Sequence, residues 1–170
     1  MSRHVEWEGK YVRILRDGTW EYVERCGGVH AVVILAEHDG KVVLVEQVRV
    51  PLGKRKCLEL PAGLVGDEDT DATVEDTAVK ELEEETGFTA ERIEVIGQFY
   101  SSPGMVAEGF TLVRAHELRR IGEGGGTEHE EIEVHLVARA DVPAFVERKR
   151  AEGVAIDVKL LLLLAANILA

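Results

Sequence analysis

Hydrophobic and polar positions alternate along much of the first third of the chain, a pattern that predicts β-strands. The segment YVRILRDGTWEYVER, residues 11–25, has Asp17-Gly18 between two such runs, and HAVVILAEHDGKVVLVEQVRV, residues 30–50, has Asp39-Gly40. An Asp-Gly pair flanked by alternating runs is a strong hairpin signal. Two β-hairpins are therefore expected, followed by a short strand in CLELPAGLVG that ends in a Pro/Gly turn.

The pattern changes to a helical one after this turn. An acidic loop precedes a helix with Thr73 as its N-cap, Asp76 three residues later and Gly87 as its C-terminal stop. The apolar run 160–170 is too short to span a bilayer and predicts a buried final helix with Asp157 as its N-cap. Further strands are expected at 92–100, 109–118 and 132–140, and a further helix at 143–152. The whole is an α+β pattern, a mixed sheet with a few helices.

The charge balance of the 170-residue chain limits its partners. Asp and Glu number 32 against 20 Lys and Arg, a net charge of -12. Such a chain is not expected to bind nucleic acid or anionic membranes, because both are negatively charged. The N-terminal MSRHVEWEGK has no apolar core of a signal peptide, and Cys26 and Cys57 lack C-x-x-C spacing. A single cytoplasmic unit with free thiols is therefore expected.

Four glutamates crowd into five positions of KELEEETGF, residues 80–88. Like charges four residues apart destabilise a helix by about 0.2–0.5 kcal/mol, so function or environment should offset that cost. Helical residues advance about 100° each, which places Glu81, Glu84 and Glu85 within one arc and Glu83 on the other side. Three carboxylates on one arc suit a hard dication such as Mg²⁺. The alternative is a solvated acidic face.

With LPAGLVG before it, this stretch resembles the Nudix box, whose pattern is G-x5-E-x7-R-E-U-x-E-E-x-G-U, with U a bulky aliphatic or similar residue. Lys80 stands in place of the arginine. The spacing from Gly63 to Lys80 is longer than the pattern, so the upstream glutamate aligns with Asp69 or is replaced by Ala72. The segments VEQVRVPLGKRKCLELPAGLV, SSPG and EHEEIEVHLV resemble the ADP-ribose pyrophosphatase branch of the same superfamily.

This resemblance implies a Nudix fold, in which a mixed β-sheet is sandwiched between helices. An N-terminal antiparallel β-extension, residues 1–28, would serve dimerisation and substrate specificity, and residues 29–170 would form the hydrolase domain. The implied reaction is Mg²⁺-dependent hydrolysis of the diphosphate bond of ADP-ribose, or of a related nucleoside diphosphate sugar, to AMP and ribose 5-phosphate. Alternatives are hydrolysis of another nucleotide sugar such as GDP-mannose, or a non-catalytic ADP-ribose sensor. The departures at Lys80 and Ala72 favour the sensor, whereas the three retained glutamates oppose it.

By the same resemblance, two or more Mg²⁺ ions, with Mn²⁺ as the alternative, would bind at the glutamates. Glu128 in the late loop is favoured as the general base, although Glu130 could exchange roles with it, and His129 between them is a bystander. The glycine-rich stretch 122–126 before them predicts a mobile lid, with an exposed linker as the alternative. Metal binding is assigned to Ala62 through its carbonyl, Glu81, Glu84, Glu85 and Glu130, and catalysis to Glu84, Glu85 and Glu128.

Two arginines and one glutamate are candidates for the diphosphate and the terminal ribose. A guanidinium fork suits phosphate oxygens, so Arg25 and Arg49 are assigned to the diphosphate, with ordinary salt bridges as the alternative. Glu108, after SSPG, would accept hydrogen bonds from the ribose, and its alternative is a surface glutamate.

Aromatic residues near the N-terminus are candidates for binding adenine. Trp20 and Tyr11 would stack on the base and Glu21 would read its exocyclic amine. The alternative is that both rings are core or edge-strand aromatics. In the family the two rings come from different subunits, which implies a homodimer with swapped N-terminal strands.

Overall fold

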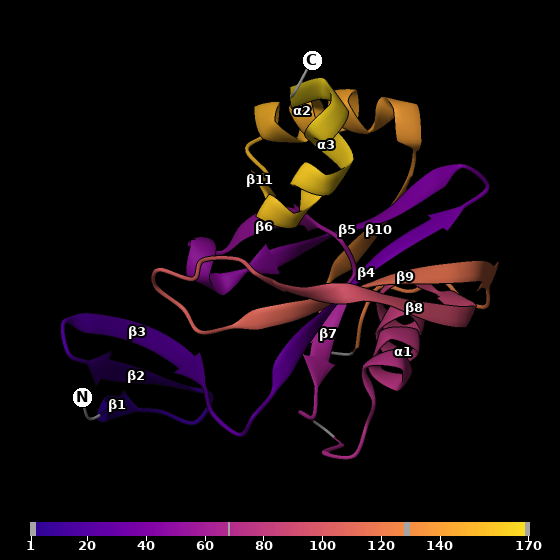
Figure 1. Ribbon diagram of the computed structural model, residues 1–170. Helices are drawn as coiled ribbons and strands as arrows, with labels where there is room; N and C mark the ends of the chain where they lie inside the picture. The colour runs from indigo at the N-terminus through magenta and orange to yellow at the C-terminus, as the bar shows by residue number, and fades with distance from the viewer. Residues whose placement is uncertain (1–2, 68, 128–129, 169–170) are drawn as a thin grey trace.

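The computed structural model describes residues 3–67, 69–127 and 130–168, in which a mixed β-sheet lies between α1 on one face and α2 and α3 on the other (Figure 1). A separate three-stranded sheet formed by the N-terminal residues projects from this body. The strands are β1 His4–Glu8, β2 Val12–Asp17, β3 Trp20–Arg25, β4 His30–His38, β5 Lys41–Arg49, β6 Arg55–Glu59, β7 Ala62–Val65, β8 Phe88–Tyr100, β9 Gly109–Arg120, β10 Ile132–Ala138 and β11 Ala155–Ile156. The α-helices are α1 Val74–Thr86, α2 Val142–Ala151 and α3 Leu161–Ile168, and the 3₁₀ turns are η1 Val50–Leu52, η2 Arg139–Asp141 and η3 Val158–Leu160. The predicted fold class is confirmed.

The N-terminal sheet is antiparallel and has the order β1-β2-β3. Its β2–β3 hairpin is the one predicted from Asp17-Gly18, whereas β1 was not expected. Two backbone hydrogen bonds join β3 to the loop before β9: Val23 N donates to Met105 O over 3.0 Å, and Ala107 N donates to Val23 O over 2.8 Å. The division of the chain at residue 28 stays a prediction.

The second predicted hairpin forms, but its strands then separate. Only Glu37 and His38 of β4 pair with β5, at Val42 and Lys41. The remainder of β4 pairs in antiparallel fashion with β7 and in parallel with β9, while β5 pairs with β6 and β10. The chain crosses from one part of the sheet to the other between β6, which pairs with β5, and β7, which pairs with β4.

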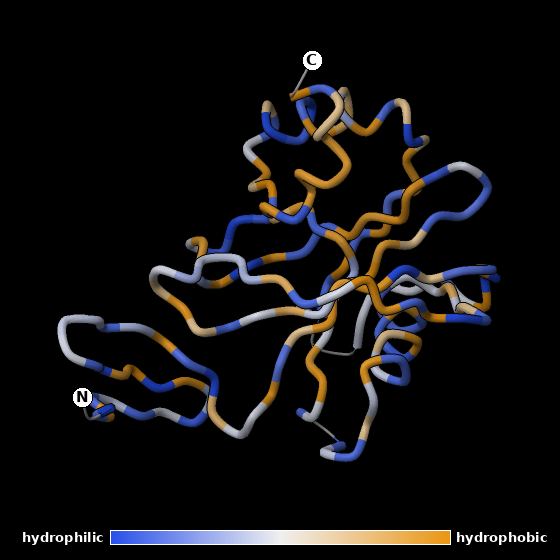
Figure 2. The backbone as a smooth tube through the Cα atoms, in the orientation of Figure 1, coloured by the Kyte–Doolittle hydropathy of each residue, from blue (hydrophilic) through white to orange (hydrophobic). Residues whose placement is uncertain are grey.

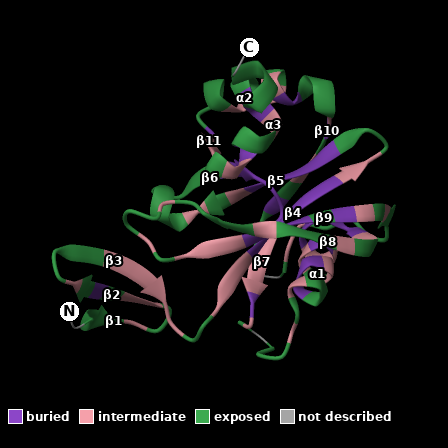
Figure 3. Ribbon diagram, in the orientation of Figure 1, coloured by how far each residue is buried: buried purple, intermediate pink, exposed green. Residues whose placement is uncertain are grey.

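Two hydrophobic clusters hold the helices against the sheet (Figures 2 and 3). Leu82 of α1 packs with Ile34 and Phe88 in one cluster, and α2 and α3 cover the other, which includes Leu58 and Leu60. The predicted ends of α1 are confirmed. Thr73 Oγ1 accepts a hydrogen bond from Asp76 N over 3.1 Å, and Gly87 ends the helix with a φ of 72°.

The C-terminal helix differs in part from its prediction. Asp157 caps η3 and Leu160 and Leu164 are buried, but Leu161 and Leu162 are 48% and 52% exposed. The run was expected to be buried throughout, yet an eight-residue helix on the outer layer has one side facing solvent. Within the described residues, none of the helices has the length and apolar character that would let it cross a membrane.

Candidate active site

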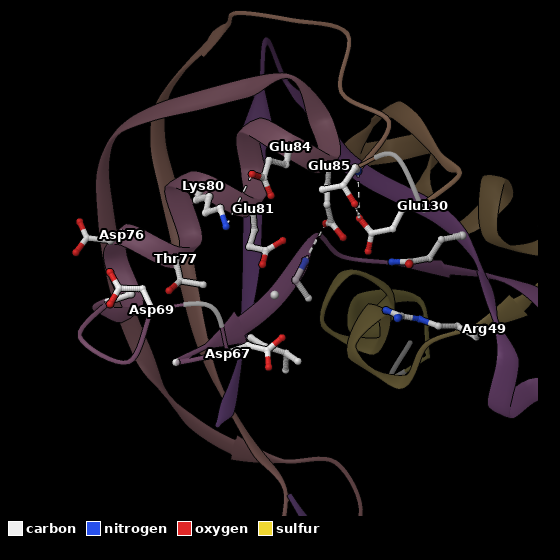
Figure 4. Close-up of a pocket in the computed structure, with 17 residues that line it drawn as sticks. Arg49, Asp67, Asp69, Asp76, Thr77, Lys80, Glu81, Glu84, Glu85 and Glu130 are labelled. Carbon is white, nitrogen blue, oxygen red and sulfur yellow. Dashed lines mark hydrogen bonds and ion pairs between the residues drawn. The ribbon is translucent and has the colours of Figure 1, made fainter. Parts of the chain in front are cut away.

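Helix α1 presents its acidic arc to a cavity of about 550 Å³. Glu81, Glu84 and Glu85 line this cavity and Glu83 does not, so the predicted shared face is confirmed. Glu130 enters from the loop before β10, and in Figure 4 its carboxylate lies near those of Glu81 and Glu85. The fifth residue assigned to metal binding, Ala62 of β7, lines the same cavity, whereas the proposed base Glu128 lies outside the described residues.

Glu85 is the most buried of these carboxylates, with 4% of the residue exposed. Its Oε2 accepts a hydrogen bond from Ala62 N over 3.1 Å, which fixes the carboxylate against β7. Burial nevertheless raises the pKa of Glu85 to about 8, and the charge of Glu81 adds to the effect. Burial likewise raises the pKa of Glu81 to about 7, with a further contribution from Glu84. A dication would favour the ionised forms, so this set of hard oxygen donors fits Mg²⁺.

Gly63 makes room for the Glu81 side chain. A Cβ added at Gly63 would lie 2.0 Å from Glu81 Oε1 and 2.1 Å from its carboxyl carbon. Any larger residue would therefore occupy the space that the carboxylate now fills. The Pro-Ala-Gly turn thus supplies two features of the site: the N–H of Ala62 that holds Glu85, and the empty position at Gly63 that admits Glu81.

The glycine-rich stretch 122–126 is docked onto the C-terminal end of α1. Gly125 N donates to Glu85 O over 2.9 Å, and Gly126 N donates to Glu84 O over 3.0 Å. A Cβ at Gly124 would lie 2.4 Å from the carbonyl carbon of Thr86, so the two backbones are in direct contact. The prediction of a mobile lid over these residues is wrong, because their N–H groups satisfy carbonyls that the helix end leaves without partners. We call residues 122–126 the glycine strap.

The insertion before α1 lies at the opposite end of the first cavity. Asp69 and Ala72, the two alternatives for the upstream glutamate, both line it, as do Asp67 and Asp76. Lys80, which replaces the box arginine, places its Nζ 3.9 Å from Glu84 Oε1 one helical turn away. The inserted segment therefore adds acidic side chains at the edge of the cavity.

A second cavity of about 390 Å³ adjoins the first and shares Arg49, Ala62 and Gly63 with it. Arg25 forms an ion pair with Glu108, and both line this second cavity. Arg49 forms a two-pronged pair with Glu59, with Nε–Oε1 and Nη2–Oε2 distances of 2.7 Å and 2.6 Å. Both arginines are thus in salt bridges, as their alternative allowed, and Glu108, whose alternative was a surface glutamate, is paired with Arg25. All three residues line the cavity.

Sequence reasoning missed three charged residues of the second cavity: Glu59, Asp157 and Lys159. Glu59 is 4% exposed although it is charged, and its one sequence signal is an acid between two leucines in an otherwise apolar run. Asp157 was read as a helix cap, which it is, and its exposure to the cavity has no local signal.

The three residues assigned to adenine lie outside both cavities of their own chain. Trp20 is 62% exposed and lines a separate hollow of about 440 Å³ with residues of the loop before β9. Tyr11 is 63% exposed, and Lys10 Nζ lies 4.8 Å from its ring centroid. Glu21 is exposed on β3. Within one chain, the structure does not bring these side chains to the glutamates.

A tighter group of possible ligands lies elsewhere on the sheet. Glu46, Glu133 and His135 each place one ligand atom within 4.8 Å of the others. Lys149 Nζ lies 2.7 Å from Glu46 Oε2, and Lys56 Nζ lies 3.1 Å from Glu46 Oε1. Two ammonium groups already neutralise the buried carboxylate, so this group is not favourable for a cation.

Comparison with known proteins relates this geometry to a family. The model of the NUDIX domain matches residues 27–157. The chain is 40% identical over 123 residues to an ADP-ribose pyrophosphatase of Bacillus subtilis, a match that covers 70% of this chain and 63%, less than two thirds, of that protein. It is 34% identical over 166 residues to a GDP-mannose pyrophosphatase of Cronobacter sakazakii, covering 92% of this chain and 79% of the relative. The fold resembles the crystal structure of an ADP compounds hydrolase, with a TM-score of 0.66 and 18% identity over 90% of this chain and 93% of that one. Because the NUDIX domain model matches most of this chain, the chain belongs to the NUDIX domain family.

Proposed function

We propose that the protein is a pyrophosphohydrolase that cleaves the diphosphate bond of ADP-ribose, or of a related nucleoside diphosphate sugar, to AMP and ribose 5-phosphate. One observation carries this proposal: the carboxylates of Glu81, Glu84, Glu85 and Glu130 line one cavity, which shares lining residues with a neighbouring cavity that has arginines in its wall. A diphosphate with a nucleoside or sugar at each end has the shape and charge that such a pair of cavities can accept. The family and the Bacillus subtilis relative support the same reaction class.

The acidic cavity would hold two or more Mg²⁺ ions, with Mn²⁺ as the alternative. Bound there, the ions would neutralise charge on the diphosphate and lower the pKa of a water molecule. Glu81, Glu84 and Glu85 would be ligands, and Glu130 and the carbonyl of Ala62 would complete the set. The hydrogen bond from Ala62 N keeps Glu85 in one orientation before any ligand binds.

Two further steps fall to other side chains. Glu128 would accept the proton of the attacking water as general base. Arg49 lines both cavities and would bind the diphosphate between them, with Arg25 further along the second cavity. Both arginines would exchange part of their contact with Glu59 and Glu108 for phosphate oxygens, and Glu108 would then be available to the terminal ribose.

We further propose that residues 1–28 form a dimerisation and specificity element and that residues 29–170 form the hydrolase domain. Trp7, Tyr11 and Trp20 are exposed on the projecting N-terminal sheet, and exposed aromatic side chains of this kind are typical of interfaces. In their own chain, Trp20, Tyr11 and Glu21 line neither of the two cavities. In a homodimer with swapped N-terminal strands, these side chains of one subunit would instead reach adenine bound at the other subunit. Cys26 and Cys57 are free thiols, which supports a cytoplasmic location.

Hydrolysis of GDP-mannose is the second candidate. It is favoured by the Cronobacter sakazakii relative, whose match extends over 92% of this chain. The same glutamates would serve either substrate, because the reacting diphosphate is the same.

A substrate panel tests the proposed function. Purified protein with Mg²⁺ is incubated with ADP-ribose, GDP-mannose, NADH and diadenosine polyphosphates, and nucleoside monophosphates are measured by chromatography. We expect AMP and ribose 5-phosphate from ADP-ribose at the highest kcat/KM. GMP from GDP-mannose at a higher kcat/KM would favour the second candidate, and tight binding of ADP-ribose without cleavage under any divalent metal would identify a sensor.

The glycine strap yields a separate prediction. Gly124→Ala should lower kcat by about 10- to 100-fold, the scale on which ligand-supporting contacts act. The added Cβ would push the strap away from Thr86 and shift Glu130, which follows it. Steady-state kinetics and melting curves are the measurements. Gly40→Ala is the matched control, because Gly40 has the same φ of 72° and no atom within 4 Å of an added Cβ. Equal loss in both variants would mean that backbone strain alone is responsible.

A further inference from the structure

The second cavity is lined by three cations, and each one is paired with a carboxylate that lines the same cavity. The pairs are Arg25–Glu108, Arg49–Glu59 and Lys159–Asp157. Its wall is therefore balanced in charge, with as many carboxylates as cations. The first cavity, by contrast, is dominated by carboxylates.

The Lys159–Asp157 pair comes from the C-terminal segment. Asp157 is the last residue that the NUDIX domain model matches, and Lys159 lies beyond it. Asp157 N donates to Leu58 O over 3.0 Å, which continues the parallel pairing of β11 with β6. Asp157 Oδ1 accepts from Lys159 N over 2.8 Å, and Oδ2 lies 2.7 Å from Lys159 Nζ. The C-terminal segment is thus fixed to the sheet and presents an ammonium–carboxylate pair to the cavity.

The surroundings of Lys159 hold its side chain in place. Only 17% of the side chain is exposed, and its Nζ lies 5.8 Å from the centroid of the Phe110 ring, within range of a cation–π contact. Phe110 and Leu52 add apolar surface to the same wall. The Lys159 ammonium can donate hydrogen bonds to hydroxyl groups and the Asp157 carboxylate can accept them, while C–H groups of a ligand pack on the Phe110 ring.

We propose that the second cavity binds the uncharged, hydroxyl-rich sugar half of the substrate, and that Lys159 and Asp157 are specificity-determining residues that hydrogen-bond its hydroxyl groups. A further phosphate beside Lys159 would be disfavoured, because Asp157 already lies next to this cation and a second anion would face its carboxylate. The volume of about 390 Å³ lies in the range of small-molecule sites and accommodates a pentose or a hexose. This inference rests on the proposed function for the position of the diphosphate.

Equilibrium binding of non-hydrolysable ligands tests the proposal on the full chain. Calorimetry in the presence of Mg²⁺ would compare three ligands: the methylene analogue of ADP-ribose, the methylene analogue of ADP methyl ester, and α,β-methylene ATP. The methyl ester keeps the ribose of adenosine but lacks the terminal sugar. We expect Lys159→Met to weaken the ADP-ribose analogue about tenfold, the scale of one hydrogen bond to a charged group, and to change the methyl ester less than twofold. Lys159→Arg should retain most of the affinity. Lys41→Met, which changes an exposed lysine at the start of β5, is the control for loss of one positive charge.

Two results would overturn the proposal. If Lys159→Met weakened the binding of the ADP-ribose analogue and of the methyl ester analogue equally, Lys159 would act on the diphosphate or the nucleoside. A larger loss for the ATP analogue than for the ADP-ribose analogue would show that the cavity is an anion site. Because these measurements need no turnover, a wild-type protein that fails to cleave any nucleotide sugar would contradict the proposed function while the binding comparison still tests the cavity.

Discussion

Glu85→Gln is expected to lower kcat for ADP-ribose by about 10³-fold, the scale for loss of one group that stabilises transition-state charge. The amide oxygen of glutamine can still accept the hydrogen bond from Ala62 N, so the side chain should keep its position. What it loses is the negative charge needed to hold a dication in the cavity. The measurement is AMP release at saturating substrate over a Mg²⁺ titration.

Glu83→Gln is the matched control for this substitution. It makes the same change of one charge on the same helix, but Glu83 does not line the cavity. Its kcat should stay within about twofold of wild type, because Glu83 is half-buried outside the cavity and would hold no dication there. If Glu85→Gln retained wild-type turnover, or if Glu83→Gln lost as much activity, the carboxylates on the cavity side of α1 would not have the role given to them.

Glu85→Gln should stabilise the metal-free protein relative to wild type, increasingly so as the pH rises toward the raised pKa of Glu85, which is about 8. Burial raises the pKa of Glu85 to about 8 in the folded state, against an ordinary value of 4.5. Between these values the folded state binds more protons than the unfolded state, so wild-type stability falls as pH rises from about 5 to 8. Melting curves in EDTA should therefore show Glu85→Gln gaining on wild type over this range, and Mg²⁺ should stabilise wild type selectively. A gap that is largest at pH 5 would contradict this direction.

Gly63→Ala is expected to lower kcat/KM by about 100-fold, near the upper end of the range for changed ligand support. The new methyl group would take the position of the Glu81 carboxylate, which lies 2.0 Å from the added Cβ. Because Glu81 has a flexible side chain, it can rotate away, and the fold should survive with a melting temperature close to that of wild type. Kinetics at increasing Mg²⁺ are the measurement, and partial recovery at high metal is expected.

Gly122→Ala is a suitable control for Gly63→Ala. An added Cβ at Gly122 would meet only the Cα of Gly87, at an ordinary contact distance of 3.9 Å, so activity should be retained. Full activity in Gly63→Ala would show that the position of Glu81 is unimportant for turnover. Unfolding of Gly63→Ala would instead place the role of this glycine in the β7 backbone.

The elements that could be predicted from sequence are those specified by local residues. The β2–β3 hairpin and the ends of α1 follow from Asp17-Gly18, Thr73 and Gly87, whose effects act within a few residues. Strand β7 was read as a turn, because Ala62–Val65 has no alternation and becomes a strand only through pairing with β4. The separation of β4 from β5 is equally non-local, since it depends on β9, more than 70 residues later.

The same distinction explains which parts of the site were predicted. The acidic arc follows from helical periodicity, which places Glu81 and Glu85 together whatever the rest of the chain does. Composition alone gave the wrong interpretation of the glycine strap, because it cannot reveal that the strap N–H groups meet the carbonyls of Glu84 and Glu85. Lys159 reaches the second cavity only because β11 pairs with β6.

Anomalous diffraction from crystals grown with Mn²⁺ and the methylene analogue of ADP-ribose tests the central claim most directly. We expect manganese peaks at about 2.0–2.3 Å from carboxylate oxygens of Glu81 and Glu85, between these residues and the diphosphate of the analogue. A bound analogue with no metal at these glutamates, or manganese found instead at Glu46, Glu133 and His135, would contradict the claim that the acidic edge of α1 exists to hold divalent cations against a diphosphate.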